Sequence, residues 1–132
     1  MDFLLSDIHD DLASSIDALL TKADMPTVIR SWIAGDRGPA QTIFGQLAEI
    51  GVFGLLIDDD HGGAGAGAVE MVVALDQLGY HGVPGPLAET IAVAPALLGA
   101  AGLPSAVHEH VAAGALVSVA APPVAPLAAD VA

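Results

Sequence analysis

The sequence contains no cysteine, so neither a disulfide bond nor thiolate chemistry is available to the protein. Basic residues are nearly absent as well: Lys22, Arg30 and Arg37 stand against 16 acidic residues, and the formal net charge is −13. Because phosphate backbones are bound by clustered Lys and Arg, this charge argues against a nucleic-acid partner. It also disfavours an anionic membrane surface. We expect the excess of acid to serve solubility.

Aromatic residues are scarce too, at 4%, whereas hydrophobic residues of all kinds make up 54% of the chain. A core built from this composition has to consist of Ala, Val, Leu and Ile, whose small side chains let helices approach closely. At 132 residues, the chain allows one domain with a sizeable core. The composition therefore favours an all-α helical bundle.

Neither a membrane-spanning run nor a secretion signal is found. One uncharged stretch, residues 111–129, is mostly alanine and is interrupted by Pro122, Pro123 and Pro126, which argues against a spanning helix. The N-terminus, M-D-F-L-L-S-D, lacks the basic region of a signal peptide. We expect a soluble, cytoplasmic protein with no membrane partner.

Hydrophobic periodicity and capping residues predict about six helices. Ser6 and Asp24 suit the N-caps of the first and second helices, and Pro26 and Pro39 suit the opening turns of the second and third. The later helices are predicted over residues 67–80, 87–101 and 104–114. Pro95 lies inside the fifth helix and is expected to kink it.

The stretch from residue 44 to 67 organises the predicted fold. An amphipathic helix runs into Gly51, a residue suited to a left-handed helix C-cap. A short apolar segment over residues 52–57 then leads into a turn of acids and glycines, and another apolar helix follows at once. This order predicts a tight helical corner, in which the glycines give the backbone room.

Residues 47–65, L-A-E-I-G-V-F-G-L-L-I-D-D-D-H-G-G-A-G, followed by Glu70 and by Leu78-Gly79, resemble the N-terminal helical domain of acyl-CoA dehydrogenases. The resemblance extends from about residue 5 to residue 121, and departs where Asp58 replaces the usual proline. It implies a helical domain over residues 1–114 and the start of a β domain over residues 115–132. The letters A-L-V-S-V-A-A at 115–121 are typical of a strand. Since one strand cannot form a sheet, this β domain is expected to be incomplete.

For the complete protein, the resemblance implies flavin-dependent introduction of an α,β double bond into an acyl-CoA thioester. A carboxylate removes the α-proton and FAD takes the β-hydride. The catalytic glutamate of the family lies in a later domain, so no catalytic residue is expected among these 132. The expected partners are acyl-CoA and either the protein's own missing domains or a second acyl-CoA dehydrogenase subunit, in a homo- or hetero-oligomer.

By the same resemblance, the helix at 87–101 lines the far end of the acyl pocket, with plain helix packing as the alternative. Its substrate-binding candidates are Leu87, Glu89, Thr90, Ile91 and Ala94. The cofactor-binding candidates are Ser118, Ala120 and Ala121, in the segment that family members continue into T-E-P. Here Ala121-Pro122-Pro123 replaces that tripeptide, and none of these side chains can donate a hydrogen bond. The chain therefore also fits a degenerate partner subunit of a heteromeric acyl-CoA dehydrogenase.

Other local patterns allow other interpretations. Asp58-Asp59-Asp60-His61 has the ligand types of a metal site, or forms a solvated turn that caps the next helix. The glycines of 62–67 imitate a phosphate loop, but they do not fully match a nucleotide-binding pattern, and the alternative is backbone room at the helical corner. His108 and His110 suggest zinc, yet at this spacing they lie on different sides of a helix. For the whole chain, a non-catalytic helical interaction module is the alternative.

Overall fold

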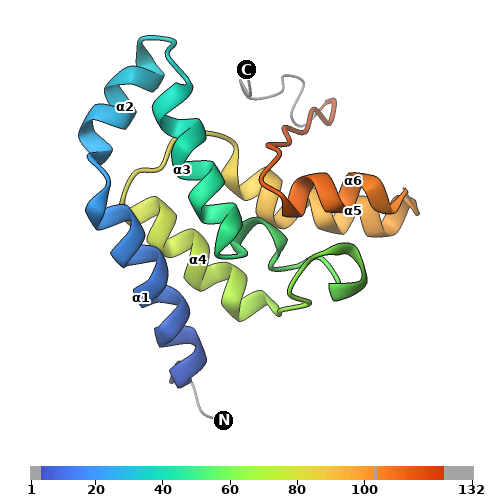
Figure 1. The fold of residues 1–132 in the computed structure, drawn as a ribbon. Helices are drawn as coiled ribbons and strands as arrows, with labels where there is room; N and C mark the ends of the chain where they lie inside the picture. Colours follow the sequence, from blue (N-terminus) through green and yellow to red (C-terminus); the bar gives the residue numbers. More distant parts are fainter. Residues whose placement is uncertain (1–3, 103, 124–132) are drawn as a thin grey trace.

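The structure, a computed structural model, describes residues 4–102 and 104–123. Over these residues the protein consists of six α-helices, two 3-10 turns and one π-helical turn, without a strand, so the all-α prediction is confirmed. Figure 1 shows α1 lying against α4, and α5 and α6 running side by side at one end. The helices are α1 (Asp7–Lys22), α2 (Met25–Ile33), α3 (Gly38–Glu49), α4 (Ala68–Tyr80), α5 (Ala94–Ala101) and α6 (Ser105–Ala112). The short turns are η1 (Val52–Gly54), η2 (Asp59–His61) and η3 (Glu89–Val93).

The predicted helix starts are confirmed. Asp24 caps α2, because its carboxylate accepts hydrogen bonds from the Thr27 amide at 3.3 Å and the Thr27 hydroxyl at 2.6 Å. The bond from the hydroxyl, followed by that from the amide, lowers the pKa of Asp24. Ser6 is the N-cap of α1, and Pro26 and Pro39 lie in the opening turns of α2 and α3.

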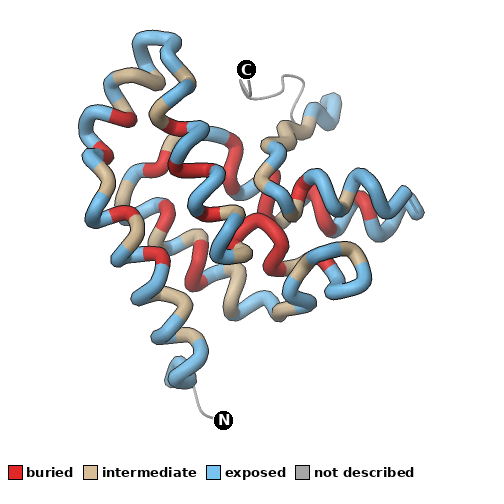
Figure 2. Tube along the Cα trace, viewed as in Figure 1, coloured by how far each residue is buried: buried red, intermediate tan, exposed pale blue. Residues whose placement is uncertain are grey.

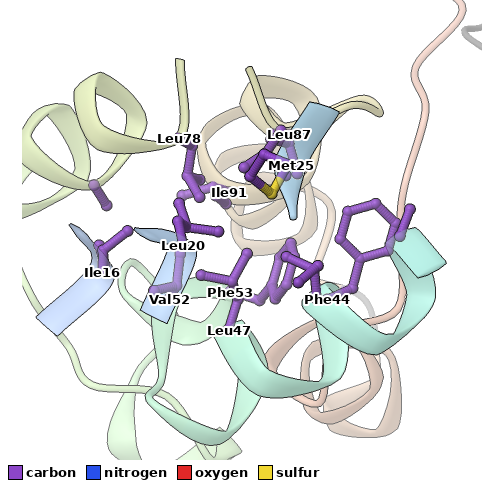
Figure 3. Packing of buried hydrophobic residues seen from close by; sticks show 14 of the residues in the cluster. Ile16, Leu20, Met25, Phe44, Leu47, Val52, Phe53, Leu78, Leu87 and Ile91 are labelled. Atoms are coloured by element: carbon purple, nitrogen blue, oxygen red, sulfur yellow. The ribbon is translucent and has the colours of Figure 1, made fainter. Parts of the chain in front are cut away.

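One large hydrophobic core is built from residues of the four helices α1, α2, α3 and α4 and of the turns η1 and η3 (Figures 2 and 3). Its aromatic members form a short chain of edge-to-face contacts: the Phe44 ring lies 6.1 Å from Trp32 and 6.3 Å from Phe53, centroid to centroid. Most of the other buried side chains are aliphatic, as the composition requires. A smaller cluster of buried residues joins the corner to α5 and α6: Ile57, Leu98 and Val111.

The corner between α3 and α4 is a crossing of two backbone segments. Gly51 follows α3 with a φ of +83°, the left-handed conformation expected of a C-cap glycine. The amides of residues 64–66 bond back to carbonyls of residues 54–57 over 2.7–2.9 Å. At the crossing, a Cβ on Gly63 would lie 1.9 Å from the Ile57 carbonyl oxygen. A side chain of any size is excluded there, so the corner depends on glycine as predicted.

The fifth predicted helix is continuous from 87 to 101, but its first part is wider than an α-helix. Pro95 has no N–H and its ring crowds the turn before it. The amide of Ala94 bonds to the Glu89 carbonyl, five residues earlier, so η3 is π-helical. A local π-turn is one of the ways in which a helix takes up such a disruption.

The strand predicted over 115–121 is not formed. Residues 115–120 have no regular secondary structure, and Ala121 alone occupies a bridge position. A strand needs a neighbouring strand to bond to, and the described residues provide none. The rest of the predicted β-domain segment, 124–132, lies outside the described residues, so the division at residue 114 stays a prediction.

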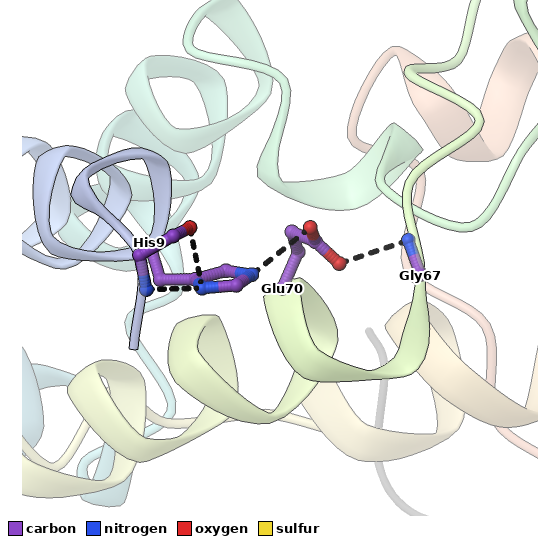
Figure 4. A network of polar contacts seen from close by, with 4 residues as sticks. His9, Gly67 and Glu70 are labelled. Atoms are coloured by element: carbon purple, nitrogen blue, oxygen red, sulfur yellow. Dashed lines mark hydrogen bonds and ion pairs between the residues drawn. The ribbon is translucent and has the colours of Figure 1, made fainter. Parts of the chain in front are cut away.

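A polar network joins α1 to α4 near their N-terminal ends (Figure 4). The His9 Nδ1 accepts a hydrogen bond from the Ser6 amide at 3.0 Å, and its Nε2 lies 3.1 Å from Glu70 Oε1. With Nδ1 accepting, the proton of the neutral ring is on Nε2 and points at the carboxylate. Glu70 Oε2 accepts from the amide of Gly67, the N-cap of α4, at 3.0 Å. Hydrogen bonds to the Glu70 carboxylate lower its pKa: the largest effect comes from its own backbone amide, followed by the Gly67 amide and the His9 ring nitrogen.

The backbone crossing predicts that Gly63→Ala lowers the free energy of unfolding by about 3 kcal/mol or more, because the new methyl group has to displace backbone. Gly45→Ala, in the middle of α3 with nothing within 4 Å of its Cβ position, is the matched control. Alanine there is expected to add about 0.5–1 kcal/mol through helix propensity. Urea unfolding followed by far-UV circular dichroism measures both. A Gly63→Ala variant as stable as the wild type would contradict the close approach of Gly63 to the Ile57 carbonyl.

Glu70→Gln tests the polar network through its pH dependence. Because the folded-state pKa is lowered, the Glu70 carboxylate stabilises the fold above its unfolded-state pKa, and this contribution is lost as the pH falls through the folded-state pKa. The difference in the free energy of unfolding between wild type and variant is therefore expected to be largest above about pH 5 and to shrink below about pH 4. Urea unfolding across this range measures it. Glu109→Gln, at an exposed α6 position whose side-chain carboxylate bonds to none of the described residues, should show no such trend.

Candidate functional site

The π-helical turn η3 and the segment that follows α6 meet at the side chain of Thr90. Thr90 Oγ1 accepts a hydrogen bond from the Val117 amide at 3.0 Å, and lies 3.1 Å from the Val117 carbonyl oxygen and 2.9 Å from that of Pro86. Its single hydroxyl proton serves one of these carbonyls at a time. In the described part of the chain, Thr90 is the one polar residue that is buried, with 0% exposure. This burial is tolerated because the hydroxyl is fully hydrogen-bonded.

Glu89 makes the same kind of contact one residue earlier. Its Oε2 accepts a hydrogen bond from the Val119 amide at 2.8 Å. Val117 and Val119 are two residues apart, the spacing at which the amides of an extended chain point to the same edge. Glu89 and Thr90 thus take the place of a neighbouring strand along that edge.

Ser118 lies between these two bound residues. Its hydroxyl oxygen is buried and has no hydrogen-bond partner among the described residues. Leaving a buried hydroxyl unpaired costs about 1–3 kcal/mol. The position therefore marks a place where a contact from outside the described residues would be favourable.

Two hollows lie elsewhere on the surface. One, of about 350 Å³, is lined by Trp32 of α2, by Arg37 before α3, by residues of α3 and by residues of the segment that follows α6. The Arg37 guanidinium lies 3.9 Å from the Trp32 ring centre and donates a 2.6 Å hydrogen bond to the Trp32 carbonyl. The other hollow, of about 790 Å³, is an open groove between α1, α2 and α3. Neither contains a residue predicted as a site, and periodicity could not show them, because separate helices form each one.

The family model described as "Acyl-CoA dehydrogenase, N-terminal domain" matches residues 6–103. The chain belongs to the acyl-CoA dehydrogenase family. It is 31% identical over 80 residues to "Acyl-CoA dehydrogenase IpdE2" of Mycobacterium tuberculosis, a match that covers 60% of this chain and 25% of that protein. The chain thus matches about a quarter of the length of this curated relative. No solved structure matches it.

The acyl-pocket candidates of this acyl-CoA dehydrogenase chain all lie on the helix of η3 and α5, and most of them point inward. The buried ones are Leu87, Thr90, Ile91 and Ala94. Leu87 and Ile91 belong to the main core. Glu89 is partly exposed, and it is bonded to Val119. Contact of these residues with an acyl chain stays a prediction.

The outward side of the same helix carries a second apolar stripe that sequence reasoning missed. Val93 is 39% exposed and Leu97, one turn later, is 49% exposed. Val107 on the neighbouring α6 is also 39% exposed. The helix is apolar on most of its circumference, so periodicity could not show which side faces the core of this chain.

The residues predicted to bind the flavin have few side-chain groups that could form a hydrogen bond with a flavin ring. Ser118 offers one hydroxyl, which is buried. Ala120 and Ala121 are exposed and have no polar side-chain atom, and Pro122 and Pro123 have no N–H. Apart from that hydroxyl, this segment can give a flavin backbone groups alone. These residues do not fit a flavin site of their own.

The other predicted sites have structural explanations. Within residues 4–102 and 104–123, no group of three or more His, Asp or Glu is placed to hold a metal ion. His61 stacks on His108 with ring centroids 5.0 Å apart, and His110 Nδ1 lies 2.6 Å from the Ala106 carbonyl oxygen. The acidic turn begins η2 and does not cap α4, whose N-cap is Gly67 with its amide bonded to Glu70. No helix in this part of the chain is long and apolar enough to cross a membrane.

Serine substitutions at two adjacent positions test which side of α5 faces the hydrophobic core. Leu98 is 8% exposed and Leu97 is 49% exposed. Leu98→Ser is expected to lower the free energy of unfolding by about 2–4 kcal/mol, as other truncations of buried leucine do. Leu97→Ser should stay within about 0.5 kcal/mol of the wild type. Urea unfolding measures both, and equal losses would contradict the orientation of the helix.

Proposed function

We propose that this chain is the helical N-terminal part of a flavin-dependent acyl-CoA dehydrogenase, which introduces an α,β double bond into an acyl-CoA thioester. The observation that carries the proposal is the match of the family's N-terminal domain to residues 6–103. The glycine corner that resembles this family is built around the crossing at Gly63, which supports the same assignment. In the proposed reaction the thioester loses a proton from its α-carbon and a hydride from its β-carbon, and FAD in the complete enzyme accepts the hydride.

The proposed role of this chain is to wall the acyl pocket. Its helix of η3 and α5 presents Val93 and Leu97 outward, and an acyl chain is compatible with such an apolar, uncharged face. Leu87, Ile91 and Ala94 act from inside the core, where they fix the position of this helix. The wall is therefore held by the domain's own packing before any ligand binds.

The general base is proposed to lie outside these 132 residues. The chain has four glutamates, and none is a free carboxylate in a cavity next to the helix of η3 and α5. Glu70 and Glu89 each accept a backbone amide of the fold. Glu49 and Glu109 are exposed on α3 and α6. A base that removes an α-proton has to reach the substrate directly.

A second candidate is a partner subunit that carries no flavin. Ala120, Ala121 and Pro122, which have no side-chain donor, favour this alternative. Such a chain would wall the acyl pocket of a heteromeric acyl-CoA dehydrogenase whose flavin is bound by the unlike subunit. A purely non-catalytic helical module remains a third candidate.

Purification of the protein from its own host through an N-terminal tag tests these proposals. We expect a yellow complex with flavin absorbance, which reduces ferricenium when acyl-CoA is added. Free CoA, which has no acyl group to oxidise, is the control. Mass spectrometry of the intact complex then separates identical chains from a pair of unlike acyl-CoA dehydrogenase chains. A colourless complex without acyl-CoA-dependent reduction would refute dehydrogenation and leave the helical module.

A further inference from the structure

We propose that Glu89 and Thr90 are positioning residues, which fix the path of the exit segment (residues 115–121) relative to the helix of η3 and α5. Two adjacent residues of the helix bind two alternate residues of the segment: Thr90 binds Val117 and Glu89 binds Val119. Successive residues of an α-helix point about 100° apart, and in a wider π-turn they point closer together. The π-turn at Glu89–Val93 therefore helps to bring both side chains to the same edge of the segment.

Packing alone does not explain a hydroxyl at position 90. A buried valine would fill the same space, but it would leave the Val117 amide and carbonyl without the partner that Thr90 provides. Threonine in a helix can bond back to the carbonyl four residues earlier, and Thr90 is in place to do so with Pro86. The contact with Val117 is additional to that local bond, and it joins residues 27 apart in the sequence.

The segment is also held through its side chains. Leu116 packs against the main core and Val117 against the smaller cluster of Ile57, Leu98 and Val111. The backbone bonds at Val117 and Val119 fix the residue between them, so Ser118 has a defined place. If the proposed function holds, this coupling makes the wall of the acyl pocket and the segment with the flavin candidates move as one unit.

Amide hydrogen exchange by NMR on the full chain tests the coupling, with matched variants at each position. Thr90→Val removes the hydroxyl and Thr90→Ser keeps it. Thr90→Val is expected to speed exchange of the Val117 amide about tenfold, and Thr90→Ser much less. Glu89→Leu should speed exchange of the Val119 amide by a similar factor, whereas Glu89→Gln keeps an oxygen acceptor and should restore most of the protection. Core amides of Ile16 and Leu47 report global stability, and each rate is compared with theirs.

The proposal is overturned if the Val117 and Val119 amides exchange at unprotected rates in the wild type. It is also overturned if valine and serine at position 90 have equal effects after correction by the core amides. Should Thr90→Val fail to fold, the Glu89 pair decides, because that side chain is partly exposed. Neither acyl-CoA nor flavin enters the measurement. A negative result therefore leaves the proposed function untouched, and a colourless purified complex leaves this coupling untouched.

Discussion

The close approach of Gly63 to the Ile57 carbonyl is the constraint on which the arrangement of helices depends. It brings residues 63–66 back along residues 54–57 and so sets where α4 begins beside α1. The same corner supports α6, since a Cβ on Gly54 would lie 3.3 Å from the Ala112 methyl group. Through α6 the corner also determines where the exit segment starts. A displacement of this turn would move the helix pair and the proposed site together.

A second constraint comes from the few aromatic side chains. Trp32, Phe44 and Phe53 form a row of contacts from the last turn of α2 to the centre of the core. Gly114, directly before the exit segment, passes close to them: a Cβ there would lie 3.8 Å from the Phe53 ring and 3.0 Å from the Ala48 methyl group. Gly114 has a φ of +97°, so a side chain there would be both crowded and strained. In a core that is otherwise aliphatic, these rings define the surface over which the chain leaves the helices.

Features fixed by neighbouring residues could be predicted from the sequence. The N-caps at Ser6 and Asp24 involve only the first turn of the helix that each one begins. Gly51 is predictable because glycine readily adopts the left-handed conformation that follows α3. The strand at 115–121 was predicted wrongly, because apolar residues such as Val117 favour a strand, whereas a strand forms through a partner far away in the sequence. Pro95 predicted a disturbed helix but not its π form. The contacts of Glu89 and Thr90 were missed, since no periodicity links residues 27–30 apart.

The contacts of Glu89 and Thr90 also explain how the exit path can persist when the residues along it change. Both side chains bind main-chain atoms of Val117 and Val119, so a substitution at 117–119 that keeps the amide keeps the bond. Cofactor contacts by side chains have no such protection, and Ala120 and Ala121 supply none. The absence of side-chain donors at Ala120 and Ala121 is therefore compatible with retention of the fold in one chain. That combination is what the proposed partner subunit would require: it would present the proposed pocket wall in the right place without binding the flavin itself.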